Sequence, residues 1–216
     1  MAARAEERAT RDAERTKEAI LVAAEDCFAR LGFEGTSMQQ IADAADVARS
    51  TPAYFFHSKE TLYDAALTRV IARGQEAMAR AYAKADTERS AEGAVESYVD
   101  AFIDLLAQDR NFLSLIQREA LGTGNRVAEF FGRPVDDAVA ALTPAAKRAG
   151  ISPQRLVLDL VALCWYPFAH EHTLLPALGM KARDPAFLDE TKEHLGELVR
   201  AITRPGRRRR TPRQPS

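Results

Sequence analysis

Residues Thr36–Glu60 read TSMQQIADAADVARSTPAYFFHSKE, and this stretch contains start signals for three closely spaced helices. Thr36 or Ser37 can cap the first helix, with Gln39 or Gln40 three residues further on, as in a capping box. The apolar residues that follow recur at the spacing of one buried helical face: Met38, Ile41, Ala42 and Ala45.

A second short helix follows after a tight turn. Asp46 and Val47 form the turn, and Ser50 or Thr51 can open the helix. Pro52 is tolerated there because first-turn amides have no acceptor within the helix. The run 58–60 then starts another helix. This pattern is typical of a helix-turn-helix, whose second helix enters the DNA major groove.

The run from Thr16 to Tyr63 resembles the DNA-binding domain of the tetracycline-repressor (TetR) family of bacterial regulators. The matching positions are Ile20, Leu21, Ala23, Ala24 and Phe28; Gly32, Phe33, Gly35, Thr36 and Ser37; Ile41, Ala42 and Val47; and Tyr54, Phe55, Phe56, Ser58, Lys59, Glu60, Leu62 and Tyr63. So many matches at fixed offsets over about fifty residues make a specific signal.

Two positions depart from the family pattern. Asp46 stands where the family usually has glycine, so it has to adopt a left-handed conformation, which Asp tolerates better than most residues. Pro52-Ala53 replaces a common Leu-Tyr pair and removes an aromatic that usually touches the DNA backbone. The departures affect affinity and half-site sequence rather than the motif.

Charge alone does not suggest nucleic acid. The 216 residues carry 30 basic and 31 acidic side chains, and six of the basic ones lie in the tail from Arg204. The body therefore holds 24 basic against 31 acidic residues, and DNA binding has to rely on a few locally placed donors.

Composition indicates a cytoplasmic protein with a sizeable core. Hydrophobic residues make up 46% of the chain, without a run long enough to span a membrane or an N-terminal secretion signal. Cys27 and Cys164 are interpreted as buried small hydrophobes, with a redox-sensing pair as the alternative.

The remaining periodicity is helical throughout, so the expected fold is all-α. Expected helices cover residues 13–31, 59–85, about 91–108, 112–121 (capped by Asn111), 126–149 with breaks at Pro134 and Pro144, 153–175 kinked at Pro167, and 185–203. The expected domains are an N-terminal arm (1–12, flexible or an extension of the first helix), a helix-turn-helix domain (13–60), a helical regulatory domain (61–205) and a disordered basic tail (206–216). Arg4, Arg8 and Arg11 of the arm either reach a minor groove or are simply solvated.

The resemblance implies a small-molecule pocket in the regulatory domain, lined mostly by apolar side chains with a few polar anchors. The candidates for lining or anchoring are Phe102, Ile116, Arg118, Glu119, Phe131, Trp165, Tyr166 and His170. The alternative for most of these is ordinary core packing, and the ligand itself is not readable.

No cofactor, metal or catalytic group is expected. His170-Glu171-His172 places two histidines at i and i+2, on different sides of a helix, and position 174 is Leu rather than the His of a zinc motif.

The family implies dimerisation through the last two long helices. Their apolar residues exceed what one small domain needs to bury: Leu156, Leu160, Leu163, Leu188, Leu195, Leu198 and Val199. Two-fold symmetry would present two recognition helices to successive major grooves of a near-palindromic operator.

Together these features predict a dimeric regulator, a repressor released from its operator by a small-molecule effector. The expected phosphate contacts are Thr36, Ser37, Tyr54, His57 and Lys59, and the expected base contacts are Gln39, Arg49, Ser50 and Thr51. Two alternatives remain open: a constitutive DNA-binding protein without an effector, and a helical enzyme on a borrowed scaffold that would depend on Glu119 or His170.

Overall fold

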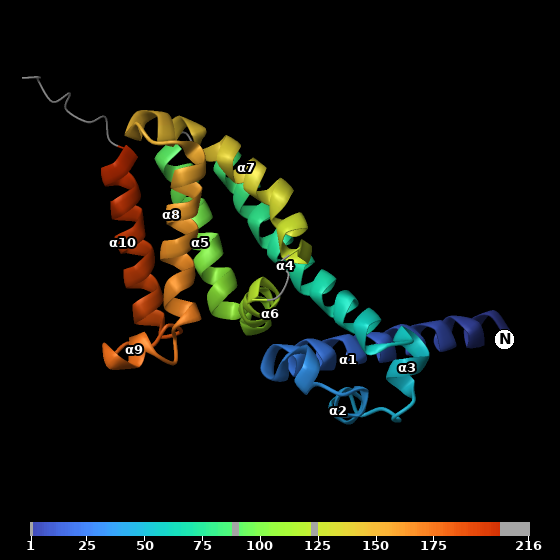
Figure 1. Cartoon of the computed structure of the whole chain (residues 1–216). Helices are drawn as coiled ribbons and strands as arrows, with labels where there is room; N and C mark the ends of the chain where they lie inside the picture. The colour runs from blue at the N-terminus through green and yellow to red at the C-terminus, as the bar shows by residue number, and fades with distance from the viewer. Residues whose placement is uncertain (1, 88–90, 122–124, 204–216) are drawn as a thin grey trace, which may run out of the picture. The chain divides into compact units, whose positions relative to one another are not determined.

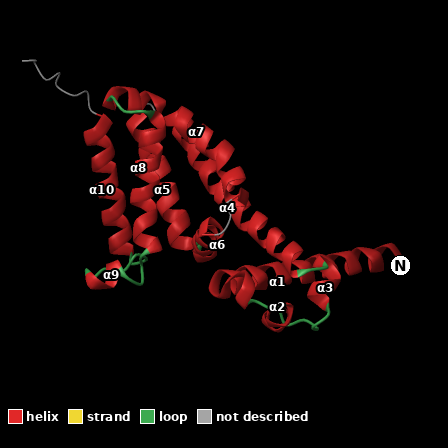
Figure 2. Cartoon of the chain, in the orientation of Figure 1, coloured by secondary structure: helices red, strands yellow, loops and turns green. Residues whose placement is uncertain are grey.

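The computed structural model describes residues 2–87, 91–121 and 125–203, which are helical and contain no strand (Figures 1 and 2). The helices in this part of the chain are α1 (Ala2–Gly35), α2 (Met38–Ala44), α3 (Thr51–Phe56), α4 (Lys59–Thr87), α5 (Ala91–Gln108), α6 (Arg110–Leu121), α7 (Asn125–Ala149), α8 (Pro153–Ala169), α9 (Leu174–Ala177) and α10 (Pro185–Thr203). The all-α expectation is confirmed. None of the helices in these residues is long and apolar enough to cross a bilayer.

The helices group into two compact units. The first comprises Met1–Gln75 and Asp109–Glu129, and the second comprises Glu76–Gln108 and Phe130–Ser216. This grouping differs from the expected boundary after residue 60, because α6 packs mainly against α1. The expected basic tail lies outside the described residues.

Helix α1 begins at Ala2, so the described part of the segment expected as an N-terminal arm is an extension of this helix, and residues 6–12 are exposed. Ile20, Ala24 and Phe28 form its buried stripe, and each is fully inaccessible to solvent. Gly32 interrupts the helix with φ 75° and ψ 174°, a conformation that side chains beyond Cα disfavour. The glycine thus ends the main part of α1, as its sequence position indicates.

A buried carboxylate ties α1 to α4 and α6 within the first unit. Glu25 is only 4% exposed and receives both terminal nitrogens of Arg73, at 2.9 and 3.0 Å. Arg69 also contacts Glu25, at 3.2 Å, and Arg73 Nε donates to Asp109 at 2.9 Å. Burial opposes the charge on Arg73, but hydrogen bonds to Glu25 and Asp109 outweigh it and raise its pKa. Removal of one partner would leave a buried charge uncompensated.

In the second unit, α5 packs against both α8 and α10. Ion pairs of 2.6 Å join Glu96 to Arg200 and Asp104 to Lys192, which sets the two helices antiparallel. In that register Asp100 lies opposite Gly196, a position on α10 between Lys192 and Arg200 that has no basic side chain. Burial raises the pKa of Asp100, Lys192 opposes this shift, and Asp104 adds to it.

Three helix boundaries correct the sequence expectations. Helix α6 begins at Arg110 rather than after Asn111, because the Asp109 carboxylate accepts the Phe112 N–H at 2.9 Å. Helix α8 ends at Ala169 instead of Leu175, two residues after Pro167, and His170 leaves the helical conformation with φ −115° and ψ 23°. Helix α7 runs through both of its prolines without a break.

Two glycines on packed helices are predicted to respond oppositely to alanine. At Gly196 an added Cβ would meet only the Arg200 guanidinium, at 3.4 Å, so Gly196→Ala should raise the free energy of unfolding by about 1 kcal/mol. At Gly74 the Cβ would lie 2.5 Å from the Phe112 ring, so Gly74→Ala should lower it by about 1–3 kcal/mol. Urea unfolding measures both, and effects of the same sign would contradict this packing.

Candidate functional site

The turn between α2 and α3 is fixed by backbone and capping bonds. Ser37 Oγ accepts the Gln40 N–H at 3.2 Å, and the Gln40 side chain accepts the Ser37 N–H at 2.8 Å. This is the expected capping box. At the other end Asp46 takes φ 53°, the Val47 N–H donates to Ala42 O at 3.1 Å, and the Asp46 N–H donates to Asp43 O at 3.3 Å. These two bonds make a Schellman motif, with Asp in the position that favours glycine.

The start of α3 presents polar side chains to solvent. Arg49 and Ser50 are exposed, and Thr51 is half-buried. Ser50 precedes the helix without using its hydroxyl as a cap. Among the described residues, no ion pair or hydrogen bond engages the Arg49 guanidinium. Gln39 is exposed on α2, so four predicted base contacts retain free or partly free polar groups.

Helix α3 is short because a strained residue ends it. His57 has φ 63° and ψ −49°, and the Ser58 N–H donates to Phe56 O across it at 2.6 Å, which makes a γ-turn. Ser58 then caps α4 by accepting the Thr61 N–H. The turn keeps Phe56 buried while His57 stays exposed, and Tyr54 on the same helix is 77% exposed. Tyr54 within α3 and His57 at its C-terminal end are therefore both solvent-facing side chains.

Two predicted phosphate contacts have other partners. Thr36 is 2% exposed, and its hydroxyl bonds Gly32 O at 2.7 Å, so it does not face a ligand. Lys59 Nζ donates to Phe33 O at 3.0 Å and lies 4.2 Å from the centre of the Phe33 ring. Thr36 is therefore too buried to contact a phosphate, whereas Lys59 keeps two further N–H groups for another acceptor.

Three residues predicted for the ligand pocket lie on α6, in the first unit, instead. Arg118 on α6 donates through Nε to Ala29 O at 3.0 Å and through Nη2 to Arg30 O at 2.8 Å. These carbonyls belong to the end of α1 before Gly32, where helical partners run out. Glu119 accepts the Tyr63 hydroxyl at 3.0 Å. Both side chains therefore hold α6 against α1 and α4, and Ile116 beside them is buried core.

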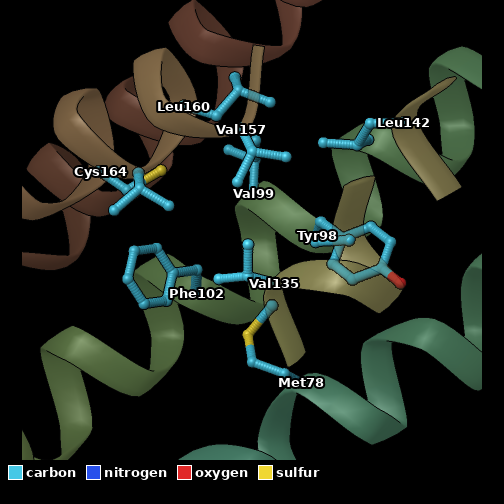
Figure 3. Close-up of a pocket in the computed structure, with 11 residues that line it drawn as sticks. Met78, Tyr98, Val99, Phe102, Val135, Leu142, Val157, Leu160 and Cys164 are labelled. Atoms are coloured by element: carbon cyan, nitrogen blue, oxygen red, sulfur yellow. The ribbon is translucent and has the colours of Figure 1, made fainter. Parts of the chain in front are cut away.

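A pocket of about 110 Å³ lies within the second unit, between α5, α7 and α8 and beside Met78 of α4 (Figure 3). Its lining is almost entirely apolar: Met78, Tyr98, Val99, Phe102, Val135, Ala138, Leu142, Val157, Leu160, Val161 and Cys164. Of the predicted ligand contacts, Phe102 is in this lining. The other lining residues look like ordinary core positions in the sequence, so periodicity could not single them out.

The remaining predicted pocket residues lie around α8. Trp165 stacks on Phe102 with ring centres 6.3 Å apart, so it stands behind one wall of the pocket. Tyr166 is half-exposed and its ring lies 4.3 Å from that of His170, the residue that ends α8. The side chain of Phe131 lies outside the described set.

The next features are the possible metal ligands and the two cysteines in the part of the chain that the structure describes. No group of three His, Cys, Asp or Glu side chains there could hold a metal ion. One oxygen of Glu171 pairs with Arg183 at 3.0 Å, and the other lies 3.5 Å from His172 Nε2. Cys27 and Cys164 are both buried and free, as interpreted from the sequence. Burial, assisted by Asp100, raises the pKa of Cys164 to about 12, so it stays a thiol.

Two family models match the chain. One, described as bacterial regulatory proteins of the tetR family, covers residues 20–66, and the other, a tetracyclin repressor-like C-terminal domain, covers residues 92–199. The HTH-type transcriptional regulator RutR of Escherichia coli K12 and that of Shigella flexneri are each 47% identical over 55 residues. That match covers 26% of this chain and 26% of each relative, so the chain spans about a quarter of their length.

Solved structures share the fold at low identity. A TetR-like transcriptional regulator from Rhodococcus sp. RHA1 is 21% identical with a TM-score of 0.66, over 85% of this chain and 93% of that one. FadR from Bacillus subtilis in complex with stearoyl-CoA is 16% identical with a TM-score of 0.60, over 83% and 97%. AibR in complex with isovaleryl coenzyme A and operator DNA is 18% identical with a TM-score of 0.66, over 85% and 97%.

The left-handed turn residue predicts a stability change with a matched control. Asp46→Gly should raise the free energy of unfolding by about 0.5 kcal/mol, because glycine adopts φ 53° without steric cost. Asp43→Gly, three residues earlier inside α2, should lower it by about 0.3 kcal/mol, the difference in helix propensity between the two residues. Thermal unfolding of both variants measures the difference, and a destabilised Asp46→Gly protein would contradict the role of the turn.

Proposed function

The chain belongs to the TetR family of bacterial regulatory proteins, and on that premise we propose that it is a cytoplasmic, dimeric repressor released from operator DNA by a small molecule. The observation that supports this most directly is the exposed Arg49, which lies in the turn just before α3. Among the described residues its guanidinium has no hydrogen bond or ion pair, and the preceding helix α2 is held by a capping box. The proposed role is binding and not catalysis.

Base readout is assigned to the start of α3 and the exposed side of α2. Arg49 is suited to the O6 and N7 acceptors of guanine, and Gln39 to adenine. Ser50 and Thr51 supply short hydroxyl donors beside Arg49. The capping bonds at Ser37 and the turn bonds at Asp46 hold these groups at a fixed spacing, which reduces the entropy lost on binding.

Phosphate contacts are assigned to Ser37, Tyr54, His57 and Lys59, which fix position without reading sequence. Lys59 is the most constrained of these, since Phe33 O already binds one of its three N–H groups. Tyr54 is the most accessible. Thr36 acts indirectly by closing the end of α1.

A second copy of the chain is the proposed partner of α8. Leu158, Leu163 and Tyr166 on this helix are 60%, 44% and 51% exposed, an apolar surface that water-facing helices rarely carry. Leu156, Leu160, Leu195 and Val199, also expected at the interface, are instead buried in the protomer's own core. The dimer would place two α3 helices on a near-palindromic site.

The pocket of the second unit is the proposed effector site. The fold neighbours FadR and AibR were solved with acyl-CoA ligands, which shows that this architecture accommodates small molecules in those proteins. An effector would act here by binding more tightly to the dimer state whose recognition helices do not fit the operator. A constitutive regulator without an effector is the competing proposal.

Replacing Arg49 is predicted to affect sequence-specific binding selectively. With DNA from upstream of the protein's own coding region, Arg49→Ala should weaken binding about 5- to 150-fold, the range for one lost bidentate base contact. Binding to unrelated DNA should change little. Fluorescence anisotropy at two salt concentrations gives both affinities.

Arg80→Ala is the control, because it removes the same charge from an exposed position on α4. An equal loss with both variants, on both DNAs, would assign Arg49 to general charge attraction and contradict base readout. Absence of salt-sensitive DNA binding by the unaltered protein would overturn the proposed function.

The exposed face of α8 predicts the oligomeric state. Leu158→Glu should weaken the dimer about 100-fold, because each of two copies loses about 1.5 kcal/mol of side-chain burial. Ala140→Glu, at an exposed position of α7, should leave dimerisation unchanged. Analytical ultracentrifugation measures both. A monomeric unaltered protein, or a Leu158→Glu dimer of full strength, would contradict the assigned face.

A further inference from the structure

The lining of the pocket in the second unit contains no charged side chain among its eleven residues. Its only side-chain polar atoms are the Tyr98 hydroxyl and the Cys164 thiol. In Figure 3 the Tyr98 oxygen points away from the side chains grouped around Phe102 and Val99. A ligand charge placed here would therefore lose its hydration without gaining a partner.

Nearby charge makes the pocket still less suitable for an anion. Cys164 remains a neutral thiol, and Asp100 on α5 lies close enough to contribute to the raised pKa of that thiol. Asp100 is flanked along α5 by Glu96 and Asp104, whose cationic partners Arg200 and Lys192 are each already engaged. The acidic groups of α5 thus supply no positive charge that would offset the lost hydration of a carboxylate or a phosphate.

Size limits the ligand as well. The pocket measures about 110 Å³, somewhat less than the roughly 150 Å³ apolar cavity that accepts benzene in another protein. A six-carbon ring or a branched group of similar bulk is near the upper limit of what the lining encloses, so the further carbons of a longer chain would extend beyond it.

From these observations we infer that the pocket takes a compact, uncharged hydrocarbon group of about five or six carbons and rejects the same group as a free anion. The group is either a whole small molecule or the apolar end of a larger one. This inference names the effector class of the proposed function and rests on it.

The chain contains its own reporter of pocket occupancy. Trp165 is the single tryptophan of the sequence, and it stacks on the pocket residue Phe102. A group that enters the pocket and moves the Phe102 ring will change the surroundings of the indole. Tryptophan emission can therefore follow binding directly, without DNA.

The test compares probes that share one six-carbon ring: cyclohexanol, cyclohexanecarboxylate and the coenzyme A thioester of that acid. Each is titrated into the full-length protein by tryptophan emission and by calorimetry. Cyclohexanol should bind at least about tenfold more tightly than the carboxylate. Tighter binding of the thioester would identify the group as the end of a larger molecule, and tighter binding of the alcohol would identify a free small molecule.

A pair of leucine substitutions on α7 locates the binding. Ala138→Leu fills the pocket and should abolish cyclohexanol binding, whereas Ala140→Leu lies on the exposed side of the same helix and should not change it. Circular dichroism of both variants confirms folding. If Ala138→Leu does not fold, 1-dodecanol serves as the second measurement and should bind no more tightly than 1-hexanol, because carbons beyond about six lie outside the lining.

Four results would overturn the inference: equal binding of carboxylate and alcohol, tightest binding of 1-dodecanol, full binding by folded Ala138→Leu, or no binding of any ring probe. None of these depends on DNA. Operator binding by the unaltered protein, measured separately by anisotropy, decides the proposed function, so failure of the ligand class and failure of the regulator assignment are distinguishable.

Discussion

The interaction on which the rest of the first unit depends is the closure of the carbonyl end of α1. Gly32 stops this helix, and the carbonyls near the break lose their helical donors. Side chains from three places replace them: Arg118 of α6 binds Ala29 O and Arg30 O, Thr36 binds Gly32 O, and Lys59 of α4 binds Phe33 O. The end of α1 is therefore the point at which three parts of the first unit are joined: the residue that leads into α2, the start of α4, and α6.

A second set of bonds holds the N-terminal end of α6. Asp109 caps α6 and also binds Arg73, which in turn pairs with the buried Glu25 of α1. Across the joint to α5, Arg183 donates to the carbonyls of Leu106 and Ala107. Leu106 and Ala107, which precede Gln108, are therefore held within the second unit, and Asp109, which follows it, is held within the first.

This arrangement separates two kinds of chemistry along one chain. The surface around α3 presents charged and hydroxyl groups to solvent, as the directional hydrogen bonds of nucleic-acid recognition require. The pocket of the second unit is lined almost entirely by apolar side chains, as burial of an apolar group requires. Polar residues that the sequence offers as ligand anchors, Arg118 and Glu119, are used instead to fix helices.

The sequence by itself determined the features that depend on local order: the capping box at Ser37, the left-handed Asp46, the break at Gly32 and the exposed Arg49. Each follows from residues within a few positions of one another. Only the tertiary structure decided that Thr36 and Arg118 close α1 and that Met78, Ala138 and Cys164 share a pocket. Arg118 lies 88 and 89 residues from the carbonyls it binds. Helical periodicity shows which face is buried, but not which distant side chain packs against it.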